Sequence, residues 1–193
     1  MKKIYLILVL ACMFATNILK AETEPNDSKA QANALALTVA DVGTVSLTES
    51  DWFSVSIPED GDLNIELTSS VNTYIQILDN DGTTSLLNLY ALGTVTRTVN
   101  GLAAGTYYVR LYNYYAFESS NYTITATLTT TGLTNDVEFN GSVATASTLP
   151  LNGTVTGHVN YYYNNERDTT DWYAVTVNQD GKLSYTITSS GLN

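Results

Sequence analysis

The residues that could carry out catalysis are few in this chain of 193 residues. It contains one histidine, His158, and one cysteine, Cys12. A Ser-His-Asp or Cys-His arrangement would depend on that one imidazole, and the sequence contains no nucleophile-elbow pattern. Paired carboxylates occur, but they lie in predicted turns rather than in a recognisable cleft. We expect no catalytic residue and no enzymatic activity in this chain.

One acidic segment begins like a calcium-binding loop. Asp79-Asn-Asp81-Gly82 matches the opening of that motif, but the glutamate that closes such a loop is missing. The same four residue types are typical of a hairpin turn. We interpret the segment as a turn.

Tyrosines gather in a segment that could bind a ligand. If residues 107–112 form a strand, alternation places Tyr108, Arg110 and Tyr112 on its outer side, and Tyr114 follows in the next loop. Tyrosine offers a large rigid surface and a hydroxyl, which suits sugars or a fibrous peptide. The alternative is that these residues only pair across strands in a tyrosine-rich sheet. The two interpretations remain open.

The charge of the chain and its first residues indicate export. There are 19 acidic and 8 basic side chains, giving a formal net charge of −11, which disfavours nucleic-acid partners. Residues 1–21 have the pattern of a secretory signal peptide, with two early lysines and an apolar run. That run is shorter than the ~20 residues of a membrane span. An uncleaved anchor and lipoprotein processing at Cys12 are the alternatives. We expect a secreted or cell-surface protein without a membrane span in the mature chain.

Alternating apolar and polar residues predict strands along most of the remaining chain. Regular strands at this spacing in about 100 residues favour an all-β, jelly-roll-like antiparallel β-sandwich of about eight strands. One short helix is possible at 28–37, and we expect Trp52 and Trp172 to fill the sandwich core. The predicted strands cover residues 42–47, 53–57, 63–67, 74–78, 85–90, 94–99, 107–112 and 122–128.

The sequence repeats itself in part. Glu24-Pro-Asn26-Asp-Ser28 recurs as Glu138-Phe-Asn140-Gly-Ser142, 114 residues later (138 against 24). Asp51-Trp-Phe53 recurs as Asp171-Trp-Tyr173, 120 residues later (171 against 51). Counterparts of the first copy beyond residue 70 do not appear. We expect a complete domain at 22–129, a linker at 130–135, a truncated second sandwich at 136–193 and further domains of the same polypeptide after Asn193.

These motifs together resemble a known bacterial family. The order of Glu24-Pro-Asn26, Asp51-Trp-Phe53, Leu102-Ala-Ala-Gly105 and Tyr122-Thr-Ile124 resembles the pre-peptidase C-terminal (PPC) domain, which is similar to clostridial collagen-binding domains. The resemblance covers residues 22–128, with half of a second copy at 136–190. It implies a non-catalytic jelly-roll sandwich that aids secretion or attachment. The family's usual place is after a catalytic domain, whereas here it follows the leader directly.

The resemblance also implies calcium as a ligand. The collagen-binding relatives hold calcium with a Glu-x-Glu-x-Asn segment and with aspartates ahead of a strand, and Thr48 stands where one such aspartate is expected. Calcium accepts 6–8 oxygen ligands in irregular geometry, so two separate stretches could enclose it. The alternative is that these are solvated residues that cap turns. The residues matched are Glu22, Glu24, Asn26, Asp27 and Asp51 in the first copy, and Asp136, Glu138, Asn140, Asp168 and Asp171 in the second.

The sequence therefore predicts an exported accessory module. The main hypothesis is a calcium-stabilised domain that attaches the protein to an extracellular polysaccharide, a collagen-like fibrous protein or another cell-surface ligand. The alternative is a structural spacer or secretion-assisting module next to a catalytic domain outside this sequence.

Overall fold

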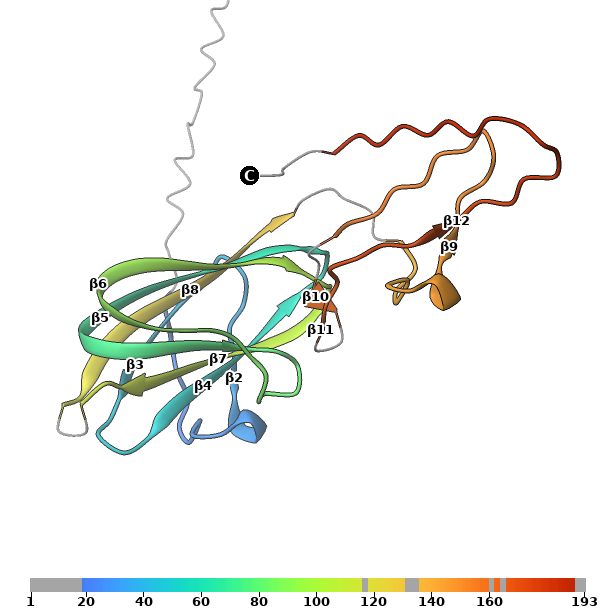
Figure 1. Ribbon diagram of the computed structural model, residues 1–193. Helices are drawn as coiled ribbons and strands as arrows, with labels where there is room; N and C mark the ends of the chain where they lie inside the picture. The colour runs from blue at the N-terminus through green and yellow to red at the C-terminus, as the bar shows by residue number, and fades with distance from the viewer. Residues whose placement is uncertain (1–18, 116–117, 131–135, 160–161, 164–165, 190–193) are drawn as a thin grey trace, which may run out of the picture. The chain divides into compact units, whose positions relative to one another are not determined.

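A computed structural model describes residues 19–115, 118–130, 136–159, 162–163 and 166–189 of the chain (Figure 1). The chain divides into two compact units, Met1–Thr131 and Gly132–Asn193, and each is considered by itself. All but the last three residues of the expected leader, and all but Thr130 of the expected linker, lie outside the described residues. Within the described residues, no helix is long and apolar enough to cross a membrane.

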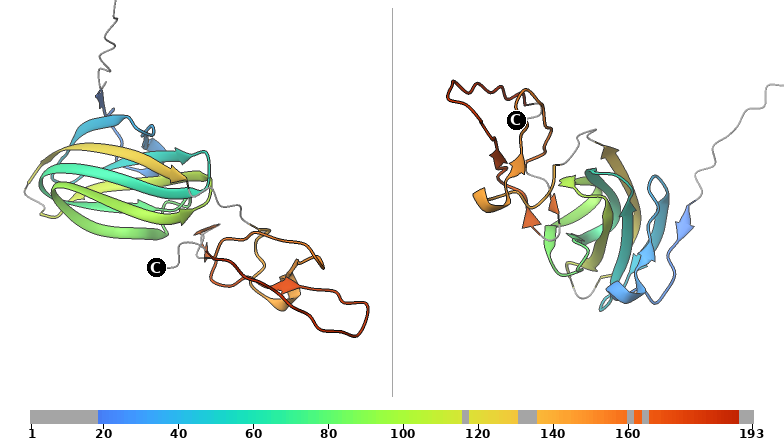
Figure 2. Two further views of the ribbon diagram at one scale, coloured as in Figure 1. Left: turned by 90° about the horizontal axis from the view of Figure 1, so that it is seen from above. Right: turned by 90° about the vertical axis from the view of Figure 1, so that its right-hand side faces the viewer.

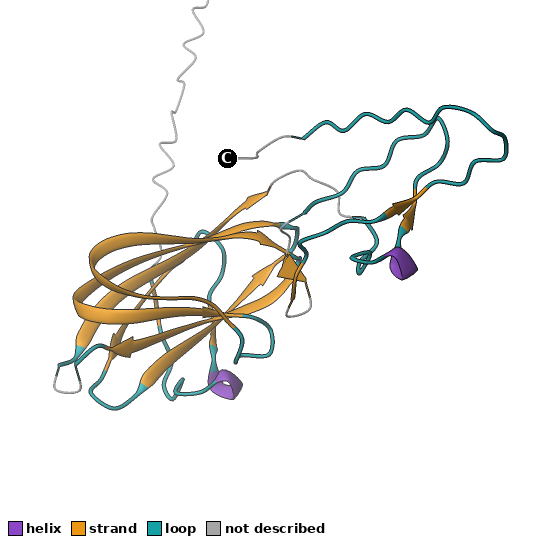
Figure 3. Cartoon of the chain, in the orientation of Figure 1, coloured by secondary structure: helices purple, strands orange, loops and turns teal. Residues whose placement is uncertain are grey.

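The first unit is built almost entirely of strands (Figure 3), which confirms the all-β class. A single turn of 3-10 helix, η1 (Lys29–Gln31), stands where a short helix was expected at 28–37. The strands are β1 (Lys20–Ala21), β2 (Asn33–Ala34), β3 (Ala40–Val45), β4 (Ser50–Ile57), β5 (Gly61–Leu78), β6 (Ser85–Leu102), β7 (Gly105–Asn113) and β8 (Ser120–Thr130).

Two long strands join the two layers of this unit. The first half of β5, residues 61–69, pairs with β8, and its second half, residues 73–78, pairs with β7. β6 runs antiparallel to β5 along both halves. One layer therefore contains β1, β3, β8 and the first half of β5, and the other contains β2, β4, β7 and its second half. The continuous sheet curls until these two halves face each other (Figure 2).

The strand prediction differs from the structure at the two bends. Residues 63–67 and 74–78 belong to one strand rather than two, and residues 85–90 and 94–99 belong to another. The register of β5 against β6 shifts between Ser69 and Thr73, so the chain bends there without a reversing turn. The pairings β1–β3 and β2–β4 are parallel, whereas the prediction was a purely antiparallel sandwich.

The core of the first unit follows the predicted alternation, with one correction. Phe53, Val55 and Ile57 of β4 are buried, and so are Tyr107, Val109 and Leu111 of β7. Trp52 is not in the core, because its position on β4 points to the outer side of the layer, where its ring meets Tyr108 edge to face. Phe53 occupies the core position instead.

The second unit has less regular structure among its described residues. It contains the 3-10 turn η2 (Val143–Thr145) and the strands β9 (Ser147–Thr148), β10 (Tyr162–Tyr163), β11 (Glu166–Arg167) and β12 (Tyr173–Ala174). β9 pairs with β12 in parallel, as β2 does with β4 in the first unit. The described part of this unit has no second layer of strands, and Trp172 is exposed rather than buried in a core.

Candidate metal centres and an aromatic face

The N-terminal segment of the first unit is fixed to both layers. The Glu22 amide donates to the carbonyl of Val42 on β3 at 3.0 Å. Four residues later, the carbonyl of Asn26 accepts a hydrogen bond from the amide of Trp52 on β4 at 2.9 Å. The segment between them therefore crosses from one layer to the other, and its acidic side chains meet the start of β4.

These contacts bring three carboxylates of the first unit together. Oxygens of Glu22, Glu24 and Asp51 all lie within 4.8 Å of one another. Asp51 and the adjacent Asn26 are fully buried, since the alternation of β4 points Asp51 inward at the end of the sandwich. Burial raises the pKa of Asp51 to about 8, and the neighbouring charges of Glu22 and Glu24 add to the shift.

Hydrogen bonds hold Glu22 in this cluster and leave other oxygens unused. The Glu22 carboxylate accepts from the amide of Thr44 at 2.7 Å, from Asn26 Nδ2 at 3.1 Å and from the Tyr122 hydroxyl. Among the described residues, neither Asp51 oxygen nor Asn26 Oδ1 has a hydrogen-bond partner, although all three atoms are buried. Buried polar atoms are nearly always paired, so these three oxygens are suited to bind a cation.

The second unit contains a similar cluster at the equivalent positions. Oxygens of Asp136, Glu138 and Asp171 lie within 4.8 Å of one another, next to the buried Asn140 and Asp168. The amide of Trp172 donates to the carbonyl of Asn140, matching the bond from Trp52 to Asn26. One oxygen on each of the following five side chains is buried without a partner in the described part of the chain: Asp136, Glu138, Asn140, Asp168 and Asp171.

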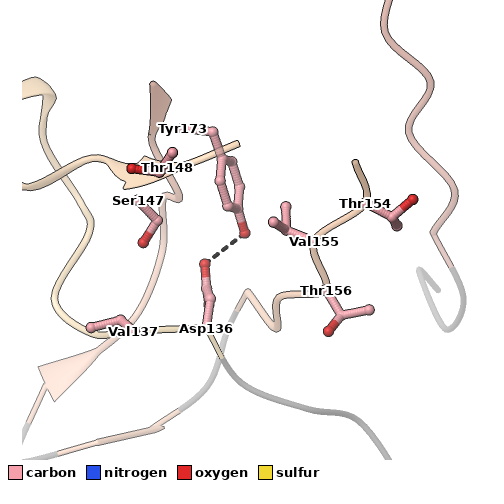
Figure 4. Close-up of a pocket in the computed structure, with 8 residues that line it drawn as sticks. All are labelled: Asp136, Val137, Ser147, Thr148, Thr154, Val155, Thr156 and Tyr173. Carbon is pink, nitrogen blue, oxygen red and sulfur yellow. Dashed lines mark hydrogen bonds between the residues drawn. The ribbon is translucent and has the colours of Figure 1, made fainter. Parts of the chain in front are cut away.

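A tyrosine hydroxyl completes each cluster, but from different positions. In the first unit the donor is Tyr122 of β8. In the second unit Tyr173 of β12 donates to Asp136 Oδ2 at 2.6 Å, beside the hydroxyl groups of a small pocket (Figure 4). Tyr173 aligns with Phe53 in the repeat, so the two hydroxyls are not equivalent in sequence. Because the repeat does not align the two tyrosines, the sequence did not point to either of them as a member of its cluster.

Two positions that the sequence analysis considered for the calcium site, Asp27 and Thr48, lie outside the cluster of Glu22, Glu24 and Asp51. Asp27 is outside the buried cluster; it meets Glu24 and Glu49 in a second, more exposed group. Thr48 is exposed, and its neighbour Glu49 joins that second group, which the sequence analysis did not include. In the second unit the aligned aspartate, Asp168, is present and is buried beside the cluster.

The chemistry of both clusters suits calcium. Every candidate ligand is a carboxylate, amide or hydroxyl oxygen, which hard divalent cations prefer over nitrogen or sulfur ligands. Burial raises the pKa values of Glu24 and Glu138 and raises the pKa of Asp171 to about 7, because close carboxylates resist ionising without a counter-charge. A bound cation would remove that cost.

The acidic loop at 79–82 is a turn, as interpreted from the sequence. Asp81 accepts hydrogen bonds from the amides and hydroxyls of Thr83 and Thr84, which lower its pKa well below the usual range. The Gly82 amide donates to the Asp79 carbonyl at 2.8 Å. The oxygens of Asp81 are thus already used within the turn.

A row of planar side chains covers the outer side of the layer that contains β4, β7 and the second half of β5. Arg110 on β7 lies between two rings, with its guanidinium carbon 5.6 Å from the centre of Trp52 and 4.8 Å from that of Tyr112. Tyr112 stacks on Tyr74 of β5 at 4.7 Å, and Tyr74 stacks on Tyr114 at 5.3 Å. We call Trp52, Arg110, Tyr112, Tyr74 and Tyr114 the aromatic row.

Further aromatic groups flank this row. Tyr90 of β6 and Tyr115 both meet Tyr114 edge to face. At the other end, Lys29 Nζ lies 4.9 Å from the centre of the Tyr108 ring. The structure thus brings the four predicted ligand-binding residues, Tyr108, Arg110, Tyr112 and Tyr114, onto one face. It adds Trp52, Tyr74 and Tyr90, which the sequence analysis did not select.

Comparison with known families finds one match within the first unit. Residues 49–113 match the family model of the bacterial pre-peptidase C-terminal domain. This confirms the resemblance inferred from the sequence, and the segment contains the aromatic row apart from Tyr114. Domains of this family are non-catalytic accessory modules and are typically extracellular.

Solved structures give similar but distant matches. The pre-peptidase C-terminal domain of a Bacillus anthracis collagenase matches with a TM-score of 0.43 and 15% identity, over 49% of this chain and 93% of that one. The Aeromonas hydrophila periplasmic inhibitor of g-type lysozyme matches with a TM-score of 0.41 and 9% identity, over 51% and 97%. The Yersinia pseudotuberculosis-derived mitogen matches with a TM-score of 0.38 and 16% identity, over 52% and 89%. No curated protein matches the chain.

Proposed function

We propose that the first unit is an exported, non-catalytic binding module that attaches its polypeptide to an extracellular polysaccharide or fibrous protein. The observation that carries this proposal is the aromatic row on one outer face. Large side chains seldom gather on a sheet exterior unless a partner covers them, and tyrosine and arginine are frequent at binding hot spots. Tyr90 and Tyr114 are 59% and 44% exposed, so the outer end of this face is open to a partner.

Calcium is the proposed cofactor of this module. The cluster of Glu22, Glu24 and Asp51 would hold the ion, with Asn26 as a further oxygen ligand. Its role would be structural, since it would clamp the N-terminal segment across both layers. The cluster around Asp136 and Asp171 would hold a second ion in the same way, which supports the proposal that residues 136–189 are part of a second domain of the same type.

A binding array tests the proposed function. The full chain is applied to immobilised polysaccharides and collagen-like peptides in the presence of calcium, alongside the double variant Tyr74→Ala, Tyr112→Ala. We expect retention on at least one ligand and its loss in the variant, because those two rings form the centre of the row. The control is Thr96→Ala, Thr125→Ala on the outer side of the opposite layer. Equal retention of all three proteins, or of none, would favour the structural spacer.

A further inference from the structure

The aromatic row presents edges rather than faces to its surroundings. Arg110 lies between Trp52 and Tyr112, and Tyr74 lies between Tyr112 and Tyr114, so neighbouring groups cover one another's flat surfaces. The rim of an aromatic ring is the positive part of its quadrupole, and the face is the negative part. A ligand that approaches this layer therefore meets ring edges, phenol hydroxyls and the edge of a guanidinium group.

The strands of this face carry no carboxylate on their outer side. The strand segments that form it are β4, β7, residues 73–78 of β5 and residues 85–92 of β6. Their only carboxylate is Asp51, which points inward and is fully buried. Arg110 is the one cation of these strand segments, and Lys29 of the 3-10 turn η1 lies against Tyr108. The opposite layer differs, since Asp62 and the exposed Glu66 lie on its outer side.

The guanidinium group is held ready for an anion. Arg110 donates from Nη2 to Ser50 Oγ at 2.9 Å, and its ring contacts on both sides fix the plane of the group. A planar guanidinium recognises carboxylate or sulfate through paired hydrogen bonds, and holding it in advance reduces the entropy lost on binding. No carboxylate pairs with Arg110 in the described part of the chain.

We propose that the aromatic row binds an acidic polysaccharide, one whose sugars bear carboxylate or sulfate groups. Arg110 would bind the anionic substituent, while the tyrosine hydroxyls would bind neighbouring sugar oxygens. This inference rests on the proposed function and specifies its ligand. Neutral sugars are less suited, because they stack on open ring faces and most faces in this row are covered. The net charge of −11 opposes every polyanion alike, so the preference for this ligand rests on Arg110 and on the lack of outward carboxylates on these strands, and nucleic acid is an outcome that the test decides.

A fluorescence titration tests the inference on the full chain. The chain has two tryptophans, so Trp172→Phe leaves Trp52, next to Arg110, as the only indole reporter. The probes are hexagalacturonate and its fully methyl-esterified form, which has the same backbone without the charges, at a constant calcium concentration. We expect saturable binding of the acid and at least about tenfold weaker binding of the ester.

Two variants in the same background assign the contact. Arg110→Gln should weaken binding of the acid by about tenfold or more, and Arg110→Lys should have an intermediate effect because it keeps the charge without the planar fork. Lys182→Gln removes one charge from the second unit and should bind like the parent. If the Arg110 variants unfold, the comparison of acid and ester in the parent still tests whether the ligand must be anionic.

The outcomes separate this inference from the proposed function. Three results would overturn the acidic-polysaccharide assignment and leave the proposed binding function standing. They are equal binding of the acid and the ester, binding of a collagen-like peptide but not of hexagalacturonate, and tighter binding of oligothymidylate than of hexagalacturonate. Failure of every probe here, together with no effect of the tyrosine substitutions in the array, would overturn both.

Discussion

Asp51 shows how one side chain can make folding depend on a cation. Its carboxyl group is fully buried, neither oxygen accepts a hydrogen bond from a described residue, and Glu22 and Glu24 adjoin it. Without a counter-charge such a group favours its neutral form, which is why its pKa rises to about 8. With calcium bound, the same charge becomes a ligand.

Asp51→Asn should therefore have opposite effects with and without calcium. With chelator at pH 7, the variant should melt above the parent by roughly 5 °C, because Asp51 must take up a proton when the chain folds and the amide avoids that cost of at least about 1 kcal/mol. With calcium, the parent should melt higher, because the amide is a weaker ligand. Differential scanning calorimetry with calcium or chelator measures both values. Glu66→Gln, on an exposed outer position, should change neither. A parent protein whose melting temperature ignores chelator would remove the calcium proposal.

The raised pKa of Asp51 also predicts how stability depends on pH. The unfolded carboxyl titrates near ~4, and the folded one near 8, so the folded state binds the proton more tightly. In chelator, this contribution to the free energy of unfolding is complete below pH ~4 and is lost as the pH rises towards 8. Calcium competes with that proton, so calcium affinity should rise over the same interval.

Unfolding in urea at several pH values, with and without calcium, measures this dependence. Other groups also titrate, so the informative quantity is the difference between the parent and Asp51→Asn. That difference should grow with pH in chelator. A difference that stays constant from pH 5 to 8 would assign the titration to another group.

At the scale of elements, β3 positions the first ligand of the cluster through a glycine. A Cβ atom on Gly43 would lie 2.2 Å from Cδ of Glu22, so the carboxylate of Glu22 occupies space that a side chain would fill. Gly157 is the equivalent position in the second unit, where a Cβ would lie 3.2 Å from Asp136 Cγ and 2.5 Å from the Tyr173 hydroxyl. The two glycines are 114 residues apart, the same offset as the acidic segments.

Gly43→Ala should therefore weaken calcium binding more than it weakens the fold. The Glu22 carboxylate would swing out of the cluster and exchange its hydrogen bonds for bonds to water, and in chelator this loss is offset because a negative charge leaves the neighbourhood of Asp51. We expect calcium affinity to fall about tenfold or more, with a nearly unchanged melting temperature in chelator. Isothermal titration with calcium measures the first and calorimetry the second. Gly105→Ala on β7, where a Cβ would meet only one atom at 3.9 Å, is the control. A large loss of stability in chelator would assign Gly43 a packing role instead.

The elements also show how far sequence could predict the structure. Alternation located every strand segment of the first unit from residue 40 to 130, because one face of each strand is buried. It could not show that β5 and β6 each continue through a bend, since Ser69 to Thr73 looks like a turn unless the partner strands are known. It misplaced Trp52, because the larger ring sits outside and Phe53 fills the core. The acidic segments were visible as a repeat, whereas the Tyr122 hydroxyl arrives from a strand about 100 residues away.

At the scale of the molecule, equivalent positions in the two units have different environments. Leu63, Ile65 and Leu67 on the first half of β5 are completely buried between the layers. Their counterparts 120 residues later are Leu183, Tyr185 and Ile187, which are 53%, 77% and 81% exposed. In the first unit, β4 and β7 of the other layer supply the opposing apolar residues, and no described strand of the second unit plays that part. Among the described residues, the same pattern is therefore packed against an opposing layer in the first unit only.

A matched pair of substitutions tests this difference. Leu63→Ala should lower the free energy of unfolding of the first unit by about 2–5 kcal/mol, because it leaves a cavity between packed layers. Leu183→Ala makes the same change at the equivalent position of the second unit. It should change the free energy of unfolding measured on the full chain by less than about 0.5 kcal/mol. Urea unfolding of the full chain, followed by near-ultraviolet circular dichroism, measures both. A comparable loss for Leu183→Ala would mean that the second unit is covered in solution, and a dependence of that loss on protein concentration would identify the cover as another copy of the chain.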